Sequence, residues 1–123
     1  MKKKIIVIDD LPDQLFTIKT SLEMDENFQV IGFETGEQCI KYLENGNIPD
    51  VILTESRMPG MTGWEIIQKI RENPLWKNIP IAFLTAWMDI KEEELEKFKI
   101  SQVIEKPFDM TDLKGRIESM MKR

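Results

Sequence analysis

The chain has 123 residues, 41% hydrophobic and 32% charged, a composition typical of one folded domain rather than of a disordered segment. Its formal net charge of −5 argues against nucleic acid as a direct partner, because binding to backbone phosphates requires a basic surface. Histidine is absent, which excludes Ser-His and Cys-His catalysis and histidine-based zinc sites. We expect residues 1–123 to form a single domain.

The amino-terminal segment and the single cysteine bear on the compartment. Three lysines at 2–4 precede only four apolar residues, 5–8, a run too short for a signal-peptide core or a membrane span. Cys39 has no second cysteine with which to form an internal disulfide. We therefore expect a cytoplasmic protein without a membrane partner.

Short apolar runs alternate along the chain with amphipathic stretches. Three of the runs are apolar without alternation, as expected for strands that helices cover on both faces. The runs predict strands at 4–9, 28–33, 50–54, 79–85 and 100–105. The stretches between and after them predict helices that begin at Pro12, span 36–43, run from Trp64 to before Pro74, span 89–98 and span 109–122.

The order of strand then helix, repeated five times, predicts parallel strands joined by right-handed crossovers. The expected fold class is α/β, with a five-stranded parallel sheet and five helices in a (βα)5 flavodoxin-like three-layer sandwich. Sheets of this kind bind ligands beyond the carboxyl ends of their strands.

Charged and hydroxyl side chains follow the predicted strands at these ends. Asp9 and Asp10 end the first strand, Glu55 follows the third, Thr85 ends the fourth and Lys106 follows the fifth. Parallel strands bring these positions to one edge, where three carboxylates outnumber one ammonium group. Such an excess favours a hard divalent cation, and oxygen ligands suit Mg²⁺. A hydroxyl and a lysine that face the cation can bind a tetrahedral anion such as a phosphoryl group.

Four motifs carry these residues, and their order and spacing resemble the receiver domain of two-component response regulators over essentially the whole chain. The motifs are VIDD at 7–10, PDVILTESRMPGMTG at 49–63, LTA at 84–86 and EKPF at 105–108. The resemblance implies a phosphorelay module without enzymatic turnover of its own. A histidine kinase or phosphotransfer protein would donate the phosphoryl group, and a downstream target or output domain would be switched.

The resemblance also implies a role for each residue of the edge. Mg²⁺ would be bound by Asp9 and Asp10, by the carboxylate at position 55 and by the backbone carbonyl of Arg57, with Asp10 a direct ligand. Position 55 is that of the family's phosphoacceptor.

The phosphoryl oxygens would contact Thr85 and Lys106, and the Lys106–Pro107 peptide bond would be cis. Taken singly, each residue has a simpler interpretation: the acidic pair as a helix cap, Thr85 as a strand-end hydroxyl, and Lys106 as a solvated loop lysine. Their convergence on one edge favours the shared site.

The main departure from the family is Glu55, which stands where the phosphoacceptor aspartate is expected. One more methylene displaces the carboxylate by about 1.5 Å, and a misplacement of about 1 Å can cost on the order of 100-fold in rate. We predict a very poor phosphoacceptor, or none. The longer side chain can also reach towards Thr85 and Lys106 and imitate part of a phosphoryl group.

Two origins of Glu55 are open. It is either an engineered phosphomimetic, which the intact surroundings favour, or natural in a phosphate-independent pseudo-receiver that acts as a protein-interaction module. A magnesium-dependent phosphatase is disfavoured because the D-x-D-x-T motif is absent. A flavodoxin-like cofactor carrier is disfavoured because DDLPDQ, at 9–14, would repel phosphate.

Overall fold

The structure, a computed structural model, describes residues 1–122 and contains one parallel sheet of five strands. The strands lie side by side in the order β2-β1-β3-β4-β5. Ile8 pairs with Phe33 and Thr54, and Thr85 pairs with Glu105, so the strands end level with one another. The strands are β1 (Lys3–Ile8), β2 (Phe28–Phe33), β3 (Val51–Thr54), β4 (Ile81–Thr85) and β5 (Gln102–Glu105).

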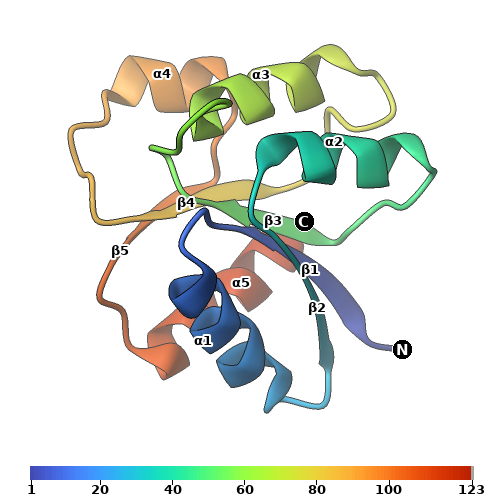
Figure 1. The fold of residues 1–123 in the computed structure, drawn as a ribbon, viewed down its shortest axis with the longest axis vertical. Helices are drawn as coiled ribbons and strands as arrows, with labels where there is room; N and C mark the ends of the chain where they lie inside the picture. Colours follow the sequence, from blue (N-terminus) through green and yellow to red (C-terminus); the bar gives the residue numbers. More distant parts are fainter. Residues whose placement is uncertain (123) are drawn as a thin grey trace.

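Five helices cover the two faces of this sheet. Helices α1 and α5 lie on one face and α2, α3 and α4 on the other, which gives three layers (Figure 1). The α/β fold class predicted from the sequence is therefore confirmed. The helices are α1 (Pro12–Glu23), α2 (Gly36–Glu44), α3 (Gly63–Glu72), α4 (Glu92–Lys97) and α5 (Met110–Met121).

The sheet has a hydrophobic core on each face. Ile5 and Val7 of β1 pack with residues of α1 and α5, whereas Ile6 and Ile8 pack with residues of α2 and α3. Successive strand residues point to opposite faces, so β1 must be apolar without alternation to fill both cores. No helix within residues 1–122 is long and apolar enough to cross a membrane.

The prediction was wrong for the fourth helix, which spans Glu92–Lys97 rather than 89–98. Its N-cap residue, Lys91, is extended and makes no side-chain cap hydrogen bond, and none of its six residues is buried. Asp89 pairs with Arg57 in a neighbouring loop instead of starting the helix. The helix ends before Lys99, whose φ is 54°. The other elements start or end within a few residues of their predicted bounds.

Candidate functional site

The site lies at the carboxyl edge of the sheet, where main-chain hydrogen bonds continue the strand pairing by one residue. The amide of Asp9 donates to the carbonyl of Phe33 (3.0 Å), and the amide of Glu55 donates to the carbonyl of Ile8 (2.9 Å). The amide of Lys106 donates to the carbonyl of Thr85 (2.9 Å). The backbone therefore places the side chains of Asp9, Glu55 and Lys106 over the same edge.

Lys106 is the cation at the centre of this site. Its Nζ donates to Asp9 Oδ2 (2.6 Å), Gln14 Oε1 (2.6 Å) and Glu55 Oε1 (3.1 Å). An ammonium group has three N–H donors, so these three acceptors use them all. The side chain of Asp9 is 2% exposed and that of Lys106 is 12% exposed, so this ion-pair network joins a buried carboxylate to a partly buried ammonium group.

The second carboxylate oxygen of Glu55 faces away from Lys106. Oε2 accepts the hydroxyl of Thr85, the amide (2.7 Å) and hydroxyl (3.3 Å) of Ser56, and the amide of Arg57 (3.4 Å). Burial raises the pKa of the Glu55 carboxyl, but the Thr85 hydroxyl and the Lys106 ammonium outweigh burial and hold this pKa below its ordinary value. Both oxygens of an ionised Glu55 are thus engaged by donors.

Thr85 connects Glu55 to the loop that follows β4. Its Oγ1 donates to Glu55, accepts the amide of Trp87 (3.0 Å) and lies 3.0 Å from Ser56 Oγ. Ser56 and Thr85 are both buried. The Thr85 hydroxyl therefore links the Glu55 carboxylate to the backbone amide of Trp87 through two hydrogen bonds.

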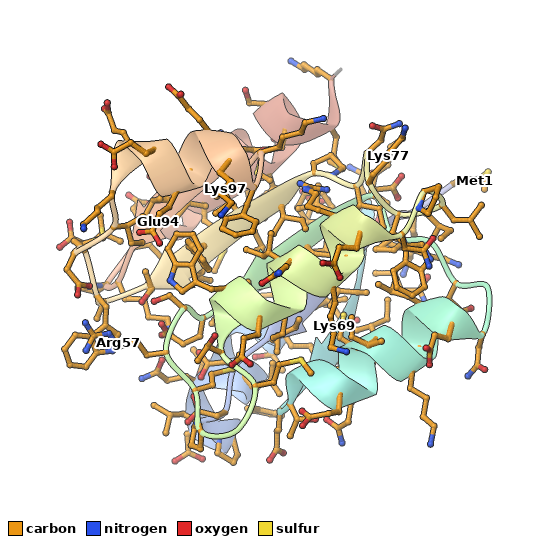
Figure 2. All side chains as sticks on the ribbon, turned by 90° about the horizontal axis from the view of Figure 1, so that it is seen from above. Met1, Arg57, Lys69, Lys77, Glu94 and Lys97 are labelled. Carbon is orange, nitrogen blue, oxygen red and sulfur yellow. The ribbon has the colours of Figure 1, made fainter. Side chains whose placement is uncertain are left out.

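Arg57 joins the loops after β3 and β4 at the surface. Its guanidinium pairs with Asp89 and lies 4.2 Å from the centroid of the Trp87 ring. Figure 2 shows Arg57 on the side of the molecule opposite to Met1 and Lys77. The ion pair is solvent-exposed, so it contributes at most about 1 kcal/mol to stability.

Two glycines, Gly60 in the loop after β3 and Gly63 at the start of α3, are required for different structural reasons. A Cβ on Gly63 would lie 2.3 Å from the carbonyl oxygen of Glu55, so only glycine allows α3 to start this close to the site. Gly60 has a φ of 75°, a left-handed conformation that glycine adopts readily. Turn geometry therefore accounts for Gly60, whereas Gly63 is required by its close approach to the Glu55 carbonyl oxygen.

The structure brings together four of the predicted site residues, Asp9, Glu55, Thr85 and Lys106. The acidic pair does not cap α1, because the N-cap residue is Leu11, and Asp9 Oδ1 instead accepts the Leu11 amide (3.0 Å).

Asp10 is half-buried beside the site. Arg57 contributes its amide and a guanidinium that points to the surface loops. Lys106–Pro107 is cis, as the resemblance implied. The catalytic and ligand roles stay predictions.

Comparison with known proteins identifies the family. The family model for the response regulator receiver domain matches residues 5–118. This chain is a response regulator receiver domain. Receiver domains are generally non-enzymatic signalling modules of two-component systems, and they typically bind Mg²⁺ at an acidic pocket.

The receiver resembles both curated and solved proteins. It is 29% identical to the heme response regulator HssR of Staphylococcus epidermidis, and the aligned region covers 96% of this chain and 51% of HssR. It is also 29% identical to a probable cyclic di-GMP phosphodiesterase of Vibrio cholerae, over 94% of this chain and 26% of that protein. The chain therefore spans from a quarter to about half of the length of these relatives.

Among solved structures, the receiver is similar to the response regulator TrrA of Thermotoga maritima in complex with Mg²⁺-BeF. The two chains are 28% identical, with a TM-score of 0.82 over 96% of this chain and 98% of TrrA.

The pocket of this receiver has magnesium-type donors in an arrangement that does not fit an ion held by the carboxylates. Within residues 1–122, no three His, Cys, Asp or Glu side chains form a group that could hold a metal ion. Glu55 is turned to Thr85, and both Glu55 and Asp9 are paired with Lys106.

Three residues of the site were missed in the sequence analysis: Gln14, Ser56 and Asp89. Each makes its contact from a helix or a loop rather than from the end of a strand. Ser56, which directly follows Glu55, was the one that proximity in sequence should have brought to attention.

Proposed function

We propose that this receiver acts in two-component signalling with Glu55 at the phosphoacceptor position, and that Glu55 moves the domain towards its switched state without a phosphoryl group. One observation carries this proposal: the Glu55 carboxylate is bound by the Thr85 hydroxyl and the Lys106 ammonium. These are the two groups that the family resemblance assigns to the phosphoryl oxygens.

The imitation is partial, because the two groups differ in charge and in acceptor number. A carboxylate has one negative charge and two oxygens, whereas a phosphoryl group has a charge of about −1.5 to −2 and three oxygens. A receiver switches by a shift between two existing conformations, so a weaker ligand of the same donors gives a smaller shift. We expect an intermediate population of the switched state.

The same contacts explain why Glu55 should not accept a phosphoryl group. A nucleophilic carboxylate must present a free oxygen in line with the leaving group. Glu55 Oε1 is bound to Lys106, and Oε2 accepts donors from Ser56, Arg57 and Thr85. The lowered pKa of Glu55 further reduces its nucleophilicity.

The partners follow from the family rather than from this chain alone. A histidine kinase or phosphotransfer protein is the expected donor, and a downstream protein or output domain is the expected target. We propose that residues 1–123 are one receiver domain.

The proposal is tested by intact mass after incubation with Mg²⁺ and a small-molecule phosphodonor. We expect no gain of a phosphoryl group by the protein and a clear gain by Glu55→Asp. Glu26→Asp, an exposed change in the turn after α1, is the matched control and should behave as the parent.

Phosphorylation of the parent would contradict the proposal that Glu55 prevents phosphoryl transfer. If neither form reacts, the site has lost phosphotransfer for another reason, and a phosphate-independent interaction module becomes the better function.

A further inference from the structure

Lys106 is held by acceptors from three separate parts of the fold. Asp9 follows β1, Gln14 belongs to α1 and Glu55 follows β3, and all three lie within 3.1 Å of Nζ. Asp9 and Glu55 are buried, and the Lys106 side chain is 12% exposed. The ammonium therefore supplies the positive charge that two buried carboxylates require.

Glu55 is unavailable as a metal ligand in this arrangement. To turn towards a cation beside Asp9 and Asp10, its carboxylate must give up the Thr85 hydroxyl and the Ser56 amide. Asp9 must also be released from Lys106. Mg²⁺ demands near-octahedral geometry and loses water reluctantly, so it does not readily compensate for these broken contacts.

We propose that Lys106 is the resident cation of this pocket, and that the receiver keeps the pocket ordered without Mg²⁺. The residue that sets this property is Glu55. A shorter side chain cannot reach Thr85 and Lys106 together, so Glu55→Asp frees a carboxylate to act as a metal ligand. The inference rests on the proposed function only in placing Glu55 at the acceptor position.

The consequence is a change in regulation. Receiver domains typically bind Mg²⁺ at the acidic pocket. In this chain the conformation of the pocket should be independent of the Mg²⁺ concentration. The state of the domain is then set by the Glu55 contacts alone.

The test uses Mg²⁺ alone, without a phosphodonor, on the full chain. Calorimetric titration at constant ionic strength compares the parent, Glu55→Asp and the control Glu26→Asp. We expect Glu55→Asp to bind Mg²⁺ about 10- to 100-fold more tightly than the parent, a change of the size that altered surroundings of metal ligands typically produce. Glu26→Asp should match the parent.

A parent that binds Mg²⁺ within about threefold of Glu55→Asp, a difference of under 1 kcal/mol, would overturn the proposal. Absence of binding by both forms would overturn it as well, because Glu55 would then not be the determinant. Phosphorylation is not measured in this titration. A parent that binds Mg²⁺ but accepts no phosphoryl group therefore refutes this inference and leaves the proposed function intact.

Lys106→Met provides a second readout, the midpoint of thermal unfolding in Mg²⁺ against EDTA. Removing the resident cation leaves Asp9 and Glu55 without a counter-charge. We expect Mg²⁺ to raise the midpoint of Lys106→Met and to leave that of the parent unchanged. Equal shifts in both proteins would overturn the role of Lys106, and if the variant does not fold, the titration of Glu55→Asp decides.

Discussion

Two partly buried cations, Lys106 and Arg71, stand near opposite edges of the sheet and are held in different ways. Lys106, at the carboxyl edge, donates to two carboxylates and one amide oxygen. Arg71, in α3, donates only to main-chain carbonyls of the segments that precede β4 and β5. Its four acceptors are the carbonyls of Lys77, Ile79, Phe98 and Lys99, at 2.8 to 3.0 Å.

The acceptors indicate that Arg71 has a structural role and that Lys106 belongs to the functional site. The carbonyls around Arg71 carry no net charge and do not titrate, so their bonds hold the two segments in the same way under all ordinary conditions. Burial lowers the pKa of Arg71, but a guanidinium stays charged in proteins. The Thr85 hydroxyl and the Lys106 ammonium hold the pKa of Glu55 below its ordinary value. The carboxylates around Lys106 carry full charges, so this network depends on charge in a way that the Arg71 contacts do not.

The largest expected effect is that of Lys106→Met. It leaves Asp9 and Glu55 as buried charges without a counter-charge and should lower the free energy of unfolding by about 3 kcal/mol at neutral pH. The penalty should shrink only as the pH falls below about 4, because the Thr85 hydroxyl and Lys106 lower the pKa of Glu55 and this carboxylate takes up its proton there. Denaturant unfolding of the parent and the variant at several pH values measures both parts. A loss that does not vary with pH would contradict the charge-based account.

Arg71→Met should cost less, about 2 kcal/mol, because the freed carbonyls are neutral and some can bind water. Arg71→Lys should recover less than half of this loss, since one ammonium cannot reach four carbonyls. Both losses should stay constant over the pH range in which the penalty of Lys106→Met changes, which is the contrast between the two cations. A loss that falls with pH would show that Arg71 also balances carboxylates.

The pH dependence of stability isolates Glu55. The pKa of Glu55 is lower in the folded chain than in the unfolded chain. The ionised carboxylate therefore stabilises the fold at pH values above the ordinary glutamate pKa of about 4.3. This contribution is lost as the pH falls through the lowered pKa of the folded state. Compared with Glu55→Gln, the parent should therefore lose its advantage only below about pH 4. A constant difference in unfolding free energy across this window would contradict the assignment.

The smallest expected effect on stability is that of Arg57→Ala, at about 0.5 kcal/mol, because its ion pair and ring contact are exposed. The tryptophan emission spectrum should still change, because the guanidinium no longer covers the Trp87 ring. The same substitution in a Trp87→Phe background should leave the emission unchanged. A response that persists there would come from Trp64 or Trp76 instead.

The fold was predictable because its signals are local. Uninterrupted apolar runs marked the buried strands, and Pro12 marked the start of α1. The α4 bounds were not predictable from spacing. Ile90 fits the helical period, but Asp89 pairs with Arg57, a contact made by residues 32 positions apart.

The site was predictable where it depends on strand ends. Asp9, Glu55, Thr85 and Lys106 each follow or end a strand, and parallel pairing brings them together. The direction in which the Glu55 carboxylate turns was only a hypothesis from its length. Gln14 was not found, because its contact depends on how α1 is rotated on the sheet.

The central claim is that Glu55 replaces a phosphoryl group at Thr85 and Lys106, and backbone amide chemical shifts test it most directly. Three samples are compared: the protein itself, Glu55→Asp alone, and Glu55→Asp with Mg²⁺ and beryllofluoride. We predict that the protein's amide shifts around Thr85 and Trp87 lie between those of the two Glu55→Asp states, displaced towards the beryllofluoride complex. Shifts that coincide with those of Glu55→Asp alone would contradict the account.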